Sequence, residues 1–294
     1  MNITFEDLLS TGAHFGHLTR KWNPNYSPYI LMVRNGIHII NLEETRKGLG
    51  KAAVFLADVA ENGGEILFVG TKKNAKDIVQ QEADKCGMFY VVERWLGGTL
   101  TNFSTIRKSI KRLQLLEKES SPLYKNATKK EILSLEREMI RLQDLHRGIK
   151  DMKRLPNAIF VVDANLETIA VQEAHQLDIP VVAIVDSNTD PRNIDYVVPA
   201  NDDSIRAVKL IVGEVSRTIC DVKNMAYAKD GESEETVTDE DTAEEEAVEI
   251  PTNGAGAESA EEPAAEADAV EAAPEPDEKE EEASVEPEGT KEEK

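Results

Sequence analysis

The residues best suited to chemistry follow the apolar, strand-like segments of the chain. GTKK follows ILFV at residues 70–73, Asp163 follows AIFVV, and DSNTDP follows VVAIV at residues 186–191. In open parallel sheets, ligands bind just beyond the strand ends. A phosphate-binding or catalytic site is therefore the first possibility that the sequence raises.

These segments do not complete a motif for nucleotide binding or catalysis. GTKKNAK lacks the second glycine and the Gly-Lys-Ser/Thr of a Walker loop, and the chain has no GxGxxG fingerprint. It also has no GxSxG elbow, and no carboxylate partner is visible in the sequence for its five histidines. We therefore expect no enzymatic activity and interpret Asp163 and Asp186 as helix caps or turn formers. A phosphate-binding α/β enzyme centred on DSNTDP is the alternative.

Metal-ligand spacing is incomplete as well. DSNTDP places Asp, Asn and Asp at the first three ligand positions of a calcium loop, but Pro191 stands at the glycine position and Val197 at that of the bidentate glutamate. His14 and His17 have the spacing of a metal pair, yet no cysteine or acidic cluster lies near them in the sequence. We expect no metal or cofactor and interpret both histidines as structural or RNA-facing.

Residues 12–30, GAHFGHLTRKWNPNYSPYI, combine aromatic rings with cations. The two prolines predict an irregular loop, and a polar loop of about 20 residues within a compact domain usually has a function. Stacking rings beside positive charge suit a nucleic-acid strand. The side chains concerned are Phe15, Arg20, Lys21, Trp22 and Tyr26.

A basic stretch interrupts the rest of the pattern. Residues 94–154 contain 15 Lys and Arg against 7 Asp and Glu, a net charge of +8 in a chain whose total is −22. Apolar residues recur there at intervals of three and four, the narrow seam of a coiled coil. They are Phe103, Ile106, Ile110 and Leu113 in one run, and Ile132, Leu135, Met139 and Leu142 in the other. We predict an antiparallel coiled-coil helical hairpin, inserted at residues 102–150.

Caps and a turn define this hairpin. Asn102 can cap the first helix, Thr128 and Glu131 can form a capping box on the second, and Pro122 prevents one continuous helix. Two pairs of adjacent cations crowd the base of the hairpin: Arg107, Lys108, Lys111 and Arg112. A merely solvated helix mixes the two signs of charge. We interpret the base as a contact surface, and a protein–protein adaptor working through the hairpin and the C-terminal tail is a second alternative.

Strand and helix signals alternate around the insertion. Strands are expected at residues 37–40, 65–70, 88–92, 158–163, 181–185 and 196–199. Helices are expected at residues 5–10, about 42–62 behind a cap at Asn41, 75–85, 166–176 and 203–222. This alternation predicts an α/β fold with a mostly parallel sheet and helices on both faces.

Four further residues could extend the cationic surface: Lys72, Lys73, Arg94 and Trp95. We hypothesise that they join the N-terminal segment and the hairpin base in one strip. Phosphate contacts along such a strip would give an affinity that falls with salt. Trp22 or Trp95 could stack on an unpaired base.

The composition changes near residue 230. Residues 1–229 contain 31 Lys and Arg and 29 Asp and Glu, whereas residues 230–294 contain 3 and 27 and no Phe, Trp or Tyr. The first segment is long enough for a sizeable core, so we predict a folded body. The second cannot bury enough apolar surface to offset its conformational entropy, so we predict a disordered acidic tail.

Nothing in the sequence indicates export or membrane insertion. Cys86 and Cys220 lack metal-ligand spacing and suit a reducing cytosol. The chain starts with a capped helix signal, Thr4 to Asp7, and no apolar run has the length of a membrane span. We expect a cytoplasmic protein.

In their order along the chain, these segments resemble the bacterial S-two family of small-ribosomal-subunit proteins. The matching runs extend over nearly all of residues 3–222 and include LLSTGAHFGHLTRKWNPNYSPYI, HIINLEET, ILFVGTKKNA, RWLGGTLTNFSTIRKSIKRL, GIKDM, LPNAIFVVDAN, IPVVAIVDSNTDP and VPANDDSIRAVKL. The resemblance implies a flavodoxin-like body with an inserted helical hairpin, bound to small-subunit ribosomal RNA at the solvent side of the head–body junction. It also implies a role in holding the large neighbouring protein S-one, without catalysis, small-molecule substrate or cofactor.

The resemblance further implies a set of RNA-facing residues within the matching runs. They are His14, His17, Arg20, Lys21, Trp22, Lys72, Lys73, Arg94, Trp95, Arg107, Lys108, Lys111 and Arg112. Two features depart from the family pattern. Lys153 and Arg154 stand where a small flexible pair is common, which concerns the hinge of the hairpin. The acidic tail is longer than usual and RNA repels a segment of charge −24, so we expect the tail to face solvent or a basic protein partner.

Overall fold

A five-stranded parallel sheet forms the centre of the structure. The computed structural model describes residues 3–118, 124 and 128–234, with side chains up to residue 224. The strands are β4 (Ile66–Val69), β5 (Phe89–Val91), β6 (Ala158–Val162), β7 (Val181–Val185) and β8 (Tyr196–Pro199). They pair in the order β5-β4-β6-β7-β8, all in parallel. Numbered within the sheet, this is the order 2-1-3-4-5 of the flavodoxin-like fold, and the predicted α/β body is confirmed.

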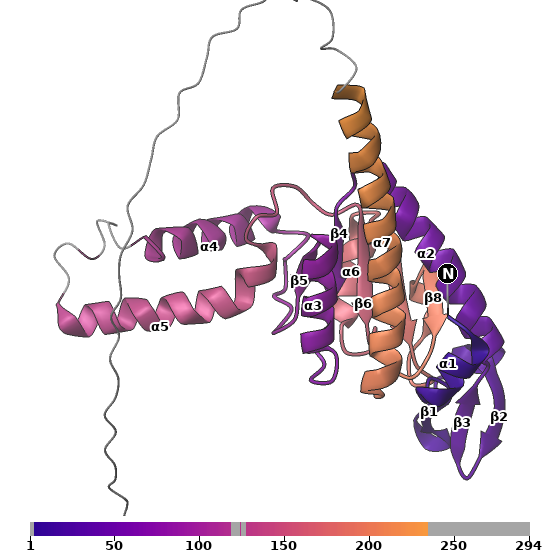
Figure 1. The fold of residues 1–294 in the computed structure, drawn as a ribbon. Helices are drawn as coiled ribbons and strands as arrows, with labels where there is room; N and C mark the ends of the chain where they lie inside the picture. Colours follow the sequence, from indigo (N-terminus) through magenta and orange to yellow (C-terminus); the bar gives the residue numbers. More distant parts are fainter. Residues whose placement is uncertain (1–2, 119–123, 125–127, 235–294) are drawn as a thin grey trace, which may run out of the picture. The chain divides into compact units, whose positions relative to one another are not determined.

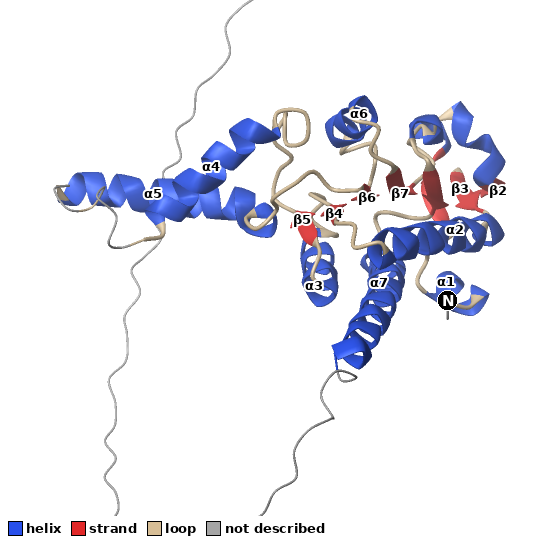
Figure 2. Ribbon diagram, turned by 90° about the horizontal axis from the view of Figure 1, so that it is seen from above, coloured by secondary structure: helices blue, strands red, loops and turns tan. Residues whose placement is uncertain are grey.

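Helices cover both faces of this sheet (Figures 1 and 2). Three helices lie on one face: α2 (Leu42–Glu61), α3 (Lys76–Cys86) and α7 (Ile205–Glu234). On the other face lies α6 (Thr168–Gln176). Strand side chains alternate between the two layers, Phe68 and Phe160 in the first core, Leu67 and Ile159 in the second. Because β4, β6 and β7 are buried on both faces, they are apolar throughout.

Two predicted helix starts are confirmed. The side chain of Asn41 accepts a hydrogen bond from the backbone N–H of Glu43 at 3.0 Å and so caps α2. Thr4 and Asp7 form a capping box at the start of α1 (Phe5–Ser10). Both caps satisfy backbone amides that have no partner within the helix.

The last helix, α7, extends beyond its predicted end at residue 222 and continues to Glu234. Its predicted apolar stripe is confirmed, since Val208, Ile211 and Val215 are fully buried. Residues 223–234 include Lys, Met, Ala and Glu, which favour helix, so the predicted tail boundary at residue 230 falls inside α7. Residues 235–294 of that tail lie outside the described residues. No helix in the described part of the chain has the length and apolarity needed to cross a membrane.

The N-terminal segment forms a small sheet where we predicted an irregular loop. Three antiparallel strands pair in the order β1-β3-β2: β1 (Phe15–Leu18), β2 (Ile30–Arg34) and β3 (Ile37–Ile40). Two 3₁₀ helices connect the first two strands: η1 (Thr19–Lys21) and η2 (Pro24–Tyr29). Asn35 and Gly36 have φ values of 52° and 74°, as a type I′ hairpin turn requires. Of these strands only β3 was predicted.

The inserted hairpin consists of α4 (Phe103–Leu116) and α5 (Lys129–His146), followed by η3 (Arg147–Ile149). The two helices are antiparallel, because Arg112 binds Glu138 while Ser109 lies 2.8 Å from His146. Figure 1 shows them side by side, projecting from the β5 edge of the sheet. Apart from Tyr124, the turn at residues 119–127 lies outside the described residues, and supercoiling of the pair stays a prediction.

The predicted apolar seam of α4 divides between two partners. Ile106 and Ile110 join the core on the α6 side of the sheet, whereas Leu113 and Leu116 pack against Leu142 of α5. The half of α4 next to the body is therefore part of the body's core. Only the outer half depends on α5 for its burial.

One of the two predicted caps of the hairpin is confirmed. Thr128 and Glu131 form the capping box of α5. Asn102 precedes α4, but its side-chain oxygen accepts from the hydroxyls of Ser104 and Thr105 and from no backbone amide. Its ψ of 45° is not the extended value from which a cap side chain reaches the first helical turn, so the predicted Asn102 cap is wrong.

Candidate nucleic-acid interface

Lys72 lies among three carboxylates at the carboxyl ends of the strands. Its Nζ is 3.3 Å from Asp163 Oδ2, 2.8 Å from Asp202 Oδ1 and 2.6 Å from Asp203 Oδ1. These partners follow β6 and β8, so the strand order brings together residues far apart in the chain. Burial disfavours the charged ammonium, but the hydrogen bonds to Asp202 and Asp203 outweigh it and raise the Lys72 pKa. Lys72 therefore serves as an internal counter-charge.

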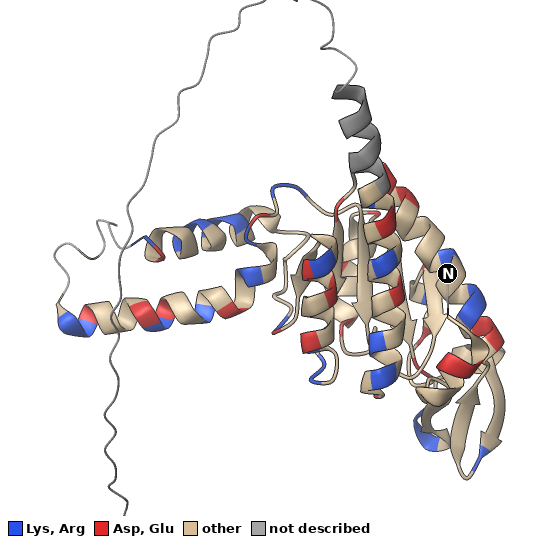
Figure 3. Cartoon of the chain, viewed as in Figure 1, with Lys and Arg blue, Asp and Glu red and all other residues tan. Residues whose placement is uncertain are grey.

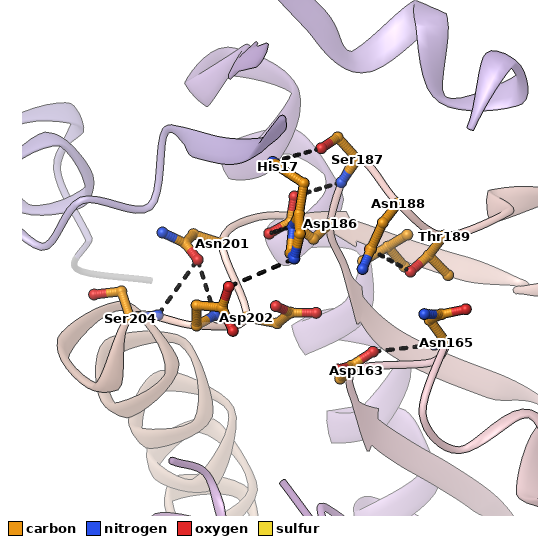
Figure 4. A network of polar contacts seen from close by, with 12 residues as sticks. His17, Asp163, Asn165, Asp186, Ser187, Asn188, Thr189, Asn201, Asp202 and Ser204 are labelled. Carbon is orange, nitrogen blue, oxygen red and sulfur yellow. Dashed lines mark hydrogen bonds and ion pairs between the residues drawn. The ribbon is translucent and has the colours of Figure 1, made fainter. Parts of the chain in front are cut away.

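His17 bridges β1 to the same cluster (Figure 4). Its Nδ1 lies 3.0 Å from Asp186 Oδ2, and its Nε2 lies 3.5 Å from Asp203 Oδ2. The hydrogen bond to Asp186 raises the pKa of His17 against the effect of burial. Our expectation that the histidines have no carboxylate partner is wrong for His17, because the fold supplies two from distant segments.

The deepest carboxylate of the cluster is Asp202, which is fully buried. Burial, followed by the nearby charges of Asp163 and Asp186, raises its pKa to about 7 despite its contact with Lys72. Donor atoms of His17, Asp202 and Asp203 lie within 4.8 Å of one another. Oxygen and imidazole ligands of this kind could hold a divalent cation, although the Lys72 ammonium already supplies positive charge there.

The cluster has no activated nucleophile among the described residues. Ser187 is fully buried, and its hydroxyl accepts the backbone N–H of His17 at 2.8 Å. The predicted turn-forming roles of the strand-end aspartates are confirmed. The side chain of Asp163 accepts from the backbone N–H groups of Asn165 and Leu166, both at 3.1 Å. The backbone oxygen of Asp186 accepts from the backbone N–H of Thr189 at 3.1 Å, which closes a turn.

A second buried carboxylate, Glu173 of α6, organises the loop that leads into α4. It accepts five hydrogen bonds: from Trp95 Nε1 at 3.1 Å, Gly98 N at 2.7 Å, Leu100 N at 3.0 Å, and Thr101 N and Oγ1, each at 3.1 Å. Burial opposes its charge, but these donors outweigh burial and lower the Glu173 pKa. The Trp95 ring is only 8% exposed, so it is not free to stack on a base in this conformation.

Exposed cations collect at the base of the hairpin. Arg107, Lys108 and Lys111 are exposed, and Figure 3 shows positive charge along the side of α4 away from α5. No ion pair joins these three to a carboxylate in the described part of the chain. Arg112, in contrast, is held by Glu138 through two hydrogen bonds of 3.1 Å.

A groove of about 580 Å³ lies beside these cations. Its lining includes Arg107 and Lys111 of α4 with Lys150 and Lys153 of the segment after η3. Two acidic residues, Glu65 and Asp151, also line it. Sequence reasoning did not assign Lys150 and Lys153, although the excess of Lys and Arg in residues 94–154 was the signal that could have indicated them.

The N-terminal sheet presents a smaller cationic group. Arg20 and Lys21 are exposed in η1, and the Trp22 ring beside them is 36% exposed with its centroid 5.0 Å from that of His38. His14 is half-buried against Phe15, and burial lowers its pKa. The predicted combination of ring and charge is present here, carried by Trp22.

The comparison with known protein families decides the identity of the fold. The model of the family described as Ribosomal protein S2 matches residues 8–222. This chain belongs to the ribosomal protein S2 family. The match spans both sheets, the hairpin and most of α7. A structural role in the small ribosomal subunit follows from the family, which is not known for enzymes.

In this S2-family chain, the predicted RNA-facing residues do not form one strip. Lys72 and Lys73 follow β4 at its carboxyl end, near His17, whereas the groove beside Arg107 contains Glu65, which precedes β4. The two groups therefore lie at opposite ends of that strand. Lys73 and Arg94 are exposed and follow β4 and β5. They therefore belong to the group at the carboxyl ends of the strands.

Proposed function

We propose that this S2-family protein binds small-subunit ribosomal RNA at the head–body junction through two separate cationic surfaces. The first is the hairpin base, and the second is the N-terminal sheet with the adjoining strand ends. The observation that carries the proposal is the exposure of Arg107, Lys108 and Lys111 without a described carboxylate partner. Unpaired positive charges on a protein surface are suited to binding the phosphates of an RNA backbone. As a ribosomal component, the protein would work in the cytoplasm.

The predicted RNA-facing residues divide into two roles under this proposal. Exposed side chains contact the RNA: Arg20, Lys21, Trp22, Lys73, Arg94, Arg107, Lys108 and Lys111. Buried or ion-paired side chains hold the segments that carry those contacts: His14, His17, Lys72, Trp95 and Arg112. This division is supported by burial and by the ion pairs described above.

Charge reversal at the hairpin base tests the RNA contact. In the full chain, Arg107→Glu with Lys111→Glu should weaken association with the small subunit, seen as a shift toward the top of a density gradient of cell lysate. Each lost phosphate contact should also reduce the slope of log affinity against log salt by about 0.7 to 0.9. The matched control is Lys209→Glu, an exposed cation of α7, which should sediment like the wild type.

Unchanged sedimentation of the double variant would remove the hairpin base from the RNA interface. If its RNA affinity stayed the same while protein neighbours were lost from the subunit, the adaptor alternative would replace this proposal.

For the docking of protein S-one, the exposed apolar side chains around α1 and β2 provide the support. A groove between these elements is lined by Phe5, Leu9, Leu31 and Ile39, and Leu31 is 61% exposed. Contiguous exposed apolar surface marks protein-interaction sites.

Leu31→Glu should lower the S-one content of purified subunits, whereas Val54→Glu, at an equally exposed position on α2, should not. Equal S-one content in both variants would place the docking site elsewhere.

A further inference from the structure

A pocket of about 510 Å³ opens between the segments that follow β6 and β7. It is lined by residues of α6, of the two loops and of η4 (Pro191–Asn193), and by Asn23 of the N-terminal segment. The pocket lies beyond the carboxyl ends of the strands, where open parallel sheets bind ligands, and it is one strand away from the switch point between β4 and β6. The cationic surfaces and the carboxylate cluster do not use this space.

Apolar side chains form the inner wall of the pocket, and amides surround it. Ala164, Val171 and Ile194 are buried in the wall. Asn165 and Gln172 are exposed at the opening, and their side chains make no hydrogen bond within the described part of the chain. These features suit a flat group with an apolar face and polar edges.

Asn188 adds an amide from the neighbouring loop. Its side-chain oxygen accepts from Thr189 Oγ1 at 3.0 Å, and its amide nitrogen has no described partner. Figure 4 shows Asn188 and Asn165 on neighbouring loops beyond the strand ends. The amides of Asn and Gln donate and accept together, which matches the mixed edge of a nucleobase.

The charges in the pocket are already paired. Arg192 donates to Asp190 through Nε and Nη2, the latter at 2.7 Å, and Asn25 donates to the same carboxylate at 3.0 Å. His175 Nε2 lies 2.5 Å from the backbone oxygen of Asn193. A phosphate would find no unpaired cation here. An uncharged ligand is therefore favoured.

We propose that this pocket takes one unpaired nucleobase of RNA. The inference rests on the proposed function, because ribosomal RNA supplies the base. Asn23, which lines the pocket, directly follows Arg20, Lys21 and Trp22, so a strand whose phosphates lie on these cations can turn a base inward. Proteins commonly recognise unstacked RNA bases by hydrogen bonds to their edges.

Three variants of the full chain test this pocket. Thr168→Trp fills it from an exposed position whose side chain makes no described hydrogen bond. Gln172→Ala removes one amide from the opening. Gln176→Ala is the matched control, because Gln176 is exposed on the same helix and does not line the pocket. Thermal unfolding confirms that each variant is folded.

The readout is base-specific chemical probing of small subunits that lack this protein and are then reconstituted with each variant. Wild type and Gln176→Ala should protect the Watson–Crick edge of one unpaired base. In Thr168→Trp and Gln172→Ala subunits that base should become reactive again while phosphate protections persist. Affinity for the subunit should fall by about tenfold in Thr168→Trp, within the range for one misread base.

Two results would overturn the inference. In the first, the wild type binds the subunit, but the base reactivities are the same in subunits that carry the wild type and in subunits that carry any of the variants. The other is tight binding of a free nucleoside (adenosine, guanosine, cytidine or uridine) to the isolated chain while no RNA base is protected, which would assign the pocket to a metabolite. Failure of the wild type to bind the subunit at all would instead refute the proposed function, and with it the source of the base.

Discussion

A buried glutamate and a partly exposed lysine hold the segments that present the exposed cations. Glu173 gathers the loop of residues 95–101 through five hydrogen bonds, and Lys72 joins the segments after β6 and β8 through three carboxylates. Loss of one partner in such an arrangement leaves the other buried and unsatisfied, which costs about 1–3 kcal/mol. These residues thus act on the surface indirectly, through the loops that they position.

Glu173→Gln tests this role for the loop before α4. The amide keeps the volume of the carboxylate but turns an NH₂ group toward backbone N–H donors. We expect the free energy of unfolding to fall by about 2 kcal/mol, measured by urea denaturation with tryptophan fluorescence, which also reports on the buried Trp95. Glu136→Gln, at an exposed position of α5, should leave the transition unchanged. An equal transition in both variants would mean that water replaces the lost hydrogen bonds.

The same residue should contribute to the pH dependence of stability. Its pKa is lower in the folded chain than the ordinary value of 4.5, so its contribution is complete above that value. The contribution is lost as pH falls below 4.5 toward the lower folded-state pKa. The difference in free energy of unfolding between wild type and Glu173→Gln should therefore shrink in acid, and a difference that grows there would contradict the assignment.

At the scale of secondary-structure elements, local patterns predicted most of the fold. Apolar runs indicated the parallel strands, and β8 has its predicted limits. Strand β3 was predicted, but its partners β1 and β2 were missed. The prolines at 24 and 28 suggested a loop over residues 12–30, which contain β1, and β2 was not recognised although Asn35-Gly36 is a type I′ signal for its hairpin with β3. The cluster around Lys72 could not be predicted from local sequence patterns, because its residues are far apart in the chain and only the strand order brings them together.

The hairpin shows the same limit of local patterns. Its two apolar seams were predicted, but periodicity does not tell which partner buries each residue, and Ile106 proved to belong to the core of the body. Trp95 was predicted to face RNA because it lies in a run that resembles the S-two family. Its burial depends on Glu173, which is 78 residues away in sequence.

The division of α4 predicts where the hairpin unfolds. In the outer half of α4, Leu113 is fully buried against Leu116 and Leu142. Leu113→Ala should therefore lower the free energy of unfolding of that part by about 2–4 kcal/mol. Hydrogen exchange should become faster along outer α4 and α5 and remain unchanged in β6. Leu115→Ala, at a position that is 48% exposed, is the control. Faster exchange throughout the sheet would show that the hairpin and body unfold as one unit.

At the scale of the whole chain, the charges are strongly segregated. Residues 1–229 are nearly balanced, while residues 235–294 contain 24 acidic and 3 basic residues. Phosphate binding depends on local cations and on salt, so an overall charge of −22 does not oppose RNA binding by the hairpin base. An acidic segment adds a repulsion that weakens as salt rises.

Truncation after Glu234, the last residue of α7, tests whether the acidic segment takes part in subunit binding. Because RNA repels it, the truncated protein should sediment with the small subunit at least as well as the full chain. Its advantage should be greatest at low salt and vanish as screening increases. A full-length variant with glutamines in place of the acidic residues beyond 234 should behave like the truncated one, which separates charge from length. Loss of sedimentation in both variants would mean that a basic protein neighbour holds the chain through this segment.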